Sequence, residues 1–90
     1  MIPRPNTDMF ASLNVSSWIG TTVVTPDHHV EGEINEVVID SVTGRVKYFV
    51  VAIGDQIGGR VTTYALPFND CQFDEQRALC IAKAMYPLRM

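Results

Sequence analysis

The chain has 90 residues, of which 47% are hydrophobic and 19% are charged. This length suits one small domain, and the composition excludes disordered and collagen-like proteins. Seven Lys and Arg against ten Asp and Glu give a formal net charge of −3, so the basic surface that attracts nucleic acid is absent and we expect no direct nucleic-acid contact. No signal-peptide pattern and no apolar run of roughly 20 residues is present, so we expect no transmembrane segment and a cytoplasmic protein.

The proline-containing stretch of residues 1–12 is interpreted as a leader, residues 13–84 as the domain and residues 85–90 as a C-terminal tail. Residues 21–25 are β-branched throughout and predict a first strand that ends at Pro26. Residues 30–40 predict a second strand. Its apolar spacing of three, from Ile34 to Val37, breaks the period of two and predicts a bulge near Asn35 or Glu36.

A turn separates this strand from the next predicted strand, residues 45–53, and the two are expected to pair antiparallel. The turn is assigned a structural role. Asp40 can cap it, Thr43 lies within it, Gly44 suits the left-handed position of a G1 bulge, and Arg45 can pair with Asp40 or Glu36.

Three glycines within residues 54–59 predict a wide loop before a strand over residues 60–66. Pro67 must end that strand or lie at a sheet edge, because proline donates no hydrogen bond to a β-ladder. Residues 69–82 predict a second hairpin with its tip at residues 74–77. About six short strands without a helical period suit an all-β barrel or sandwich.

Cys71 and Cys80 both fall in the second hairpin. Pairing Phe73 with Leu79 gathers apolar side chains on one face and turns the two cysteines to opposite faces. The alternative register, with Phe73 opposite Ala78, sets the cysteines directly across from each other. The first register is favoured, and it predicts two free thiols.

Motifs along the chain appear in the order Trp18-Ile19-Gly20, Gly32-Glu33-Ile34, Ile39-Asp40, Thr43-Gly44-Arg45 with an aromatic before Val50-Val51, and Leu66-Pro67-Phe68. Over about residues 13 to 82 the sequence resembles the PRC-barrel family. This family includes the cytoplasmic domain of the photosynthetic reaction centre H subunit, the C-terminal domain of a ribosome-maturation factor, and small stand-alone proteins. The resemblance implies a stand-alone, all-β PRC-type barrel of about six short antiparallel strands.

The strand over residues 45–53 carries apolar side chains on both faces near its end. One face, with Val46, Tyr48, Val50 and Ala52, can fill the barrel. The other, with Phe49, Val51 and Ile53, must be covered by the ends of the chain or by a second subunit. We interpret the residues of this second face as an interaction surface and predict a homodimer.

The function expected on these grounds is that of a non-catalytic adaptor that self-associates and docks a protein partner. The alternative is an accessory factor in RNA processing or ribosome maturation that contacts a ribosomal protein. No catalytic motif or cofactor motif is present, so neither an enzyme nor a bound cofactor is expected. His28 and His29 are interpreted as turn residues without a metal, and Glu31, Glu33 and Glu36 as a solvated edge rather than an acid–base pair.

Overall fold

The computed structural model describes residues 15–54 and 59–88. The predicted leader and the middle of the glycine-rich loop lie outside these residues. Its elements are, in chain order, α2 (Val15–Trp18), β1 (Thr22–Val24), β2 (Glu31–Ile39), β3 (Val46–Gly54), β4 (Val61–Pro67), the 3-10 helix η1 (Phe68–Asp70), β5 (Cys71–Asp74), β6 (Leu79–Ala82) and β7 (Tyr86–Pro87). The predicted all-β class is confirmed, with the single turn of α2 as an addition.

All strands belong to one sheet of seven strands in the order β5-β6-β1-β2-β3-β4-β7. The sequence predicted about six strands and antiparallel pairing throughout. The structure differs because β6 pairs parallel with β1. The chain leaves β4 through η1 and returns beside β1, and such a crossing connection produces a parallel pair. The predicted tail contributes as well, since Tyr86–Pro87 pairs with β4 as the seventh strand.

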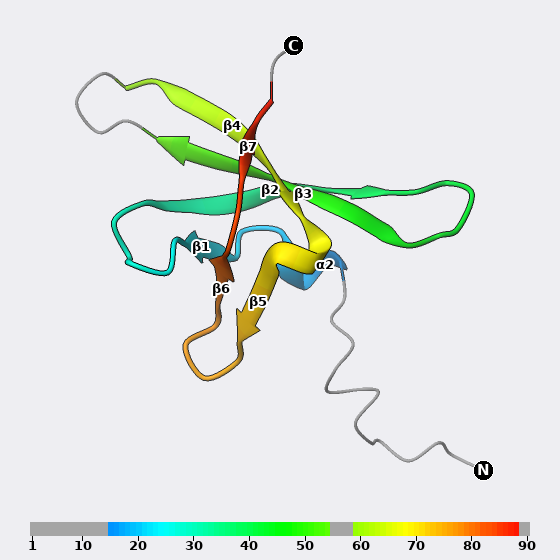
Figure 1. Ribbon diagram of the computed structural model, residues 1–90, viewed down its shortest axis with the longest axis horizontal. Coiled ribbons are helices and arrows are strands. Elements are labelled where there is room, and N and C mark those ends of the chain that lie inside the picture. Colours follow the sequence, from blue (N-terminus) through cyan, green and yellow to red (C-terminus); the bar gives the residue numbers. More distant parts are fainter. Residues whose placement is uncertain (1–14, 55–58, 89–90) are drawn as a thin grey trace.

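The long β2–β3 hairpin contains two register shifts (Figure 1). Ile34 lies opposite Val51 and Glu36 lies opposite Val50, which leaves Asn35 as the extra residue. The predicted bulge at this position is therefore confirmed. The second shift, between residues 38 and 39, leaves Lys47 unpaired on β3. Bulges bend a strand and increase its twist, and two of them in one hairpin suit the curvature of a small barrel.

The core lies on the face of the sheet that α2 and η1 cover. Its buried members are Val23, Ile34, Phe49, Val51, Leu66, Cys80 and Ala82. Trp18 of α2 contacts Phe49 edge to face, with ring centroids 4.9 Å apart, and Phe68 of η1 lies 6.0 Å from the same ring. Edge-to-face and tilted aromatic pairs are favourable beyond their buried area, so these three rings join both helical turns to the sheet.

The β5–β6 hairpin adopts neither of the two registers considered from the sequence. Cys71 lies opposite Ala82, and Phe73 lies opposite Cys80. This places both cysteines on one face, with 6.0 Å between their Cα atoms, and they form a disulfide. The prediction of two free thiols is wrong because pairing with β1 directs Cys80 and Ala82 into the core, where they are 0% and 2% exposed.

Candidate interaction surface

The predicted interaction surface lies in the core instead. Phe49 and Val51 are 1% and 0% exposed, and Ile53 packs against the buried cluster. The chain itself provides the cover, through Trp18, Phe68 and the facing strands. The prediction of an exposed face at these three positions is therefore wrong. Tyr48, Val50 and Ala52 lie on the opposite side instead, whereas Val46 packs against the core as predicted because the bulge at Lys47 shifts the alternation.

The opposite side of β2, β3 and β4 forms a second face, here called the outer face. Antiparallel partners lie on the same side of a sheet, so the strand register assigns its members. They are Glu33, Glu36 and Val38 on β2, Tyr48, Val50 and Ala52 on β3, and Val61, Thr63, Ala65 and Pro67 on β4. Tyr86 of β7 continues the row at Ala65.

None of these outer-face residues is buried. Val61 and Tyr86 are 64% and 56% exposed, while Tyr48, Val50 and Ala65 are half-buried by their neighbours in the sheet. In Figure 1, α2, β1, β5 and β6 lie together on one side of the long ribbons β2, β3 and β4. The centre of the outer face is thus apolar and partly exposed, and α2 and η1 pack through Trp18 and Phe68 on the opposite, core face.

Carboxylates line the β2 margin of this apolar centre. Glu31, Glu33 and Glu36 are all exposed. The ion pairs among the described residues are His29 with Asp27 and Arg77 with Asp74, so none of the three glutamates has a cationic partner there. The sequence predicted a solvated edge at these positions, which agrees with their exposure.

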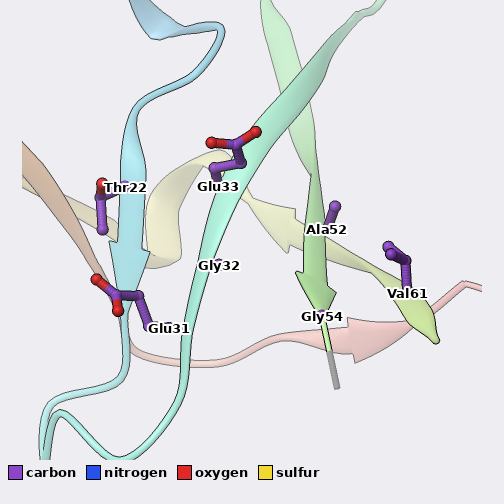
Figure 2. Close-up of a pocket in the computed structure, with 7 residues that line it drawn as sticks. All are labelled: Thr22, Glu31, Gly32, Glu33, Ala52, Gly54 and Val61. Atoms are coloured by element: carbon purple, nitrogen blue, oxygen red, sulfur yellow. The ribbon is translucent and has the colours of Figure 1, made fainter. Parts of the chain in front are cut away.

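A hollow of about 420 Å³ opens at this end of the outer face. Figure 2 shows Glu31, Gly32 and Glu33 along β2, with the Glu31 side chain extending toward β1, and Ala52 and Val61 on the side of β3 and β4. Ala52 has a short side chain, and Gly54, which also lines the hollow, has none. Its walls are therefore acidic on one side and apolar on the other.

The predicted structural turn, residues 40–45, is held by its own hydrogen bonds. The amides of Val42 and Thr43 donate to Oδ1 of Asp40 at 2.8 and 3.3 Å, and these bonds hold the pKa of Asp40 below its usual value. The amide of Arg45 donates to the Thr43 hydroxyl, and Gly44 has the predicted positive φ, 75°. The carboxylate, hydroxyl and glycine thus have local roles in shaping the turn.

Arg45 is expected to pair with Asp40 or Glu36, but the structure shows no such ion pair, although the Asp40 amide donates to the Arg45 carbonyl in the turn. Arg45 lines a hollow of about 450 Å³ together with Lys47, Pro67 and Phe68. Within the described part of the chain it forms no ion pair. The cations of this region lie at the turn end of the β2–β3 hairpin, away from the glutamate-lined hollow.

The two histidines lie in the β1–β2 turn. His29 contacts Asp27 at 3.1 Å, while His28 has a positive φ of 60°. A side-chain hydrogen bond from Thr25 and a backbone hydrogen bond from His29 lower the pKa of Asp27. Over residues 15–54 and 59–88, no group of three or more His, Cys, Asp and Glu side chains is placed to hold a metal ion.

The sequence did not indicate the outer face as a candidate surface, because the β3 alternation was assigned to the wrong sides. The alternation of Glu31 and Glu33 with Gly32 and Ile34 marks the outer side of β2, but on β3 both Tyr48-Val50-Ala52 and Phe49-Val51-Ile53 follow a period of two. No local feature of the strand shows which of two apolar faces the aromatic rings of distant segments will cover.

The all-β fold agrees with the resemblance to the PRC-barrel family that the sequence motifs indicate. No helix of the described residues is both long and apolar enough to cross a membrane. A search of curated proteins found no match. A scan against protein-family models matches residues 11–83 to the PRC-barrel domain. With this match over most of its length and an all-β sheet built as described, the chain belongs to the PRC-barrel domain family.

Proposed function

We propose that this PRC-barrel chain is a non-catalytic adaptor that docks a protein partner on the outer face of β2, β3 and β4. The observation that carries the proposal is the partial exposure of an apolar sheet face opposite the core face that α2 and η1 cover. Exposed apolar patches of this kind are typical of protein interaction sites rather than of the free surface of small monomers. Family membership is consistent with such a role, although a shared fold does not identify a partner.

The centre of the face provides the test. Val50 lies between Glu36 and Ala65 across the sheet, so Val50→Glu places a charge in the middle of the apolar strip. Val42 is 91% exposed in the turn at residues 40–45, so Val42→Glu makes the same chemical change away from the strip. Both positions are accessible in the free protein, and the fold of each variant can be verified by circular dichroism.

The tagged chain and the two variants are used to capture proteins from a lysate of the source organism. We expect the same partner with the unmodified chain and Val42→Glu, and its loss with Val50→Glu. A partner that all three forms retain equally would exclude the outer face as the docking surface. Within the described residues, nothing favours the alternative role in RNA processing over this one.

Self-association remains part of the proposal but needs a surface other than Phe49. Among the described residues, β7 pairs with Tyr64 and Ala65 of β4 and the Leu88 amide donates to the Thr63 carbonyl, so on this edge of β4 none of them pairs with the exposed Val61. Open edges pair readily with a strand of another chain, and an edge lysine suppresses such pairing. We expect light scattering to give twice the 10.0 kDa of one chain, and Val61→Lys to reduce the mass to one chain. A monomer at every concentration would exclude the homodimer.

A cytoplasmic location is likewise a proposal; the disulfide between Cys71 and Cys80 argues against it and makes it testable. Disulfides persist in oxidising compartments and are rare in reduced cytoplasm. Alkylation of thiols in intact cells, before lysis, distinguishes the two cases. A cytoplasmic protein takes up two alkyl groups, and an oxidised one takes up none.

A further inference from the structure

The occupant of the outer face can be described by its chemistry, and this inference rests on the proposed function. The face combines an apolar strip with a margin of one charge sign. The strip is formed by Tyr48, Val50 and Ala65, and the margin by Glu33 and Glu36 on β2. We propose that the outer face binds a basic amphipathic segment of another protein, with its apolar side on β3 and β4 and its cations along β2.

Complementarity of charge supports this occupant. Glu33 and Glu36 are exposed and have no cationic partner among the described residues. A row of carboxylates beside an apolar strip favours lysine or arginine in the partner and disfavours an acidic segment, because like charges brought together at an interface cost affinity. The aliphatic stems of lysine and arginine also pack on apolar surface while their charged heads remain hydrated.

The hollow at the end of the face fits the same chemistry. Glu31 and Glu33 of β2 line one side of it, and Ala52 of β3 and Val61 of β4 line the other (Figure 2). A long cationic side chain can place its stem along the apolar wall and its head beside the two carboxylates. Outward-facing residues two apart on a strand are about 6.6 Å apart, and residues four apart on a helix are separated by a rise of about 6 Å. Lysines placed every fourth residue on a helical partner can therefore follow outward-facing glutamates along β2.

A second copy of this chain is a poorer occupant. Each copy has a formal net charge of −3 and presents Glu33 and Glu36 at the margin of the face. Packing two such faces together brings glutamates from both copies to one interface. The edge of β4, rather than this face, is therefore the surface proposed above for self-association.

The probe is an 18-residue capped helical peptide in which lysines recur every four residues beside a stripe of leucines. Two matched peptides replace the lysines with glutamate or the leucines with glutamine. Fluorescence anisotropy measures the binding of each labelled peptide to the full chain. The protein variants are Glu33→Gln and Glu36→Gln, singly and together, with Glu75→Gln in the exposed β5–β6 turn as the charge-matched control.

We expect the lysine–leucine peptide to bind and both matched peptides to bind at least about tenfold more weakly. The double variant should bind the first peptide about tenfold more weakly, since each exposed charge contact accounts for a factor of a few. Glu75→Gln should bind within about twofold of the unmodified chain, and added salt should weaken binding. No binding by the lysine–leucine peptide, equal binding by the glutamate peptide, or an unaltered double variant overturns the inference.

The lysate capture separates this inference from the proposed function. If Val50→Glu loses the partner and the double glutamine variant retains it fully, docking on the outer face stands and its basic occupant is refuted. If Val50→Glu retains the partner, the docking surface itself is wrong. If Val50→Glu converts a dimer into a monomer, a second copy occupies the face and the inference is overturned.

Discussion

Among the glycines of the described residues, Gly32 is the one at which an added methyl group would meet other atoms. It lies in β2 opposite Val23 of β1. An ideal Cβ at Gly32 would lie 2.5 Å from the carbonyl oxygen of Ala52 and 2.8 Å from Cγ1 of Ile53. The Ile53 side chain can rotate away, but the backbone carbonyl belongs to the β3 ladder and moves only with its strand.

The size of the effect follows from this distance. An ordinary carbon–oxygen contact is about 3.3 Å, so Gly32→Ala must separate the two strands by roughly 0.8 Å. Overpacking of this kind costs about 1 to 3 kcal/mol. Removing glycine from the unfolded chain returns about 0.4 to 1 kcal/mol. We expect a net loss of about 1 to 2 kcal/mol, or roughly 4 to 16 °C in melting temperature for a domain of this size.

Gly54→Ala is the matched control. Gly54 ends β3 nearby, has an ordinary φ, and an added Cβ there has nothing within 4 Å. It should leave stability unchanged or raise it by up to about 1 kcal/mol. Urea and thermal unfolding are followed by circular dichroism, with equal urea slopes required so that one transition is compared. Equal stability of Gly32→Ala and the unmodified chain would refute the argument, because β2 would then be free to shift at no cost.

Four further predictions concern the turn, the core and the hairpin. Gly44→Val should destabilise the domain by more than about 1 kcal/mol, because Gly44 has a φ of 75°, at which a β-branched residue is strained. An added Cβ would have nothing within 4 Å, so backbone strain and not a clash is the cause, and an unchanged melting temperature would contradict this. Phe49→Ala leaves a cavity in the core and should lower the free energy of unfolding by about 3 to 5 kcal/mol without altering the mass of the folded fraction. A variant that dissociates but stays stably folded would instead show that Phe49 lies at a subunit interface. Hydrogen bonds from backbone amides lower the pKa of Asp40 in the folded chain, so its stabilising contribution is present above the unfolded pKa of about 3.9 and is lost as the pH falls through the folded pKa. The stability difference between the unmodified chain and Asp40→Asn should therefore narrow on acidification from about pH 5. A stability difference that stays constant would argue against the turn hydrogen bonds. Reduction of the Cys71–Cys80 disulfide, which joins residues nine apart, should lower the free energy of unfolding by roughly 3 kcal/mol. The reductant should not affect the stability of a Cys71→Ala/Cys80→Ala variant. A thiol assay that finds two thiols in the denatured, unreduced chain would contradict the disulfide.

Local features of the fold could be predicted from the residues involved. The turn at Asp40 and Gly44 depends on a carboxylate that accepts nearby amides and on a residue without Cβ at positive φ. The bulge at Asn35 follows from a break in the alternation of apolar residues. Such features depend on neighbours within a few positions, so the chain itself carries the necessary information.

The candidate site could be predicted only in part. The exposure of Glu33 and Glu36 agrees with their interpretation as a solvated edge. Their position beside an apolar strip could not be predicted, because the strip becomes a surface only when Tyr48 and Val50 face away from the core. Alternation along β3 shows that the strand has two faces, but both are apolar and the pattern does not rank them.

The sequence by itself determined the all-β class, the β2–β3 hairpin with its bulge, and the glycine-dependent turn. Only the tertiary structure decided that Phe49 is buried, because Trp18 and Phe68 reach its ring from segments far away in the chain. It also decided the β5–β6 register, because the parallel pairing of β6 with β1 brings Cys80 into the core. In both cases the deciding energy is the burial of apolar surface between distant segments, and that term acts only once the chain has brought them together.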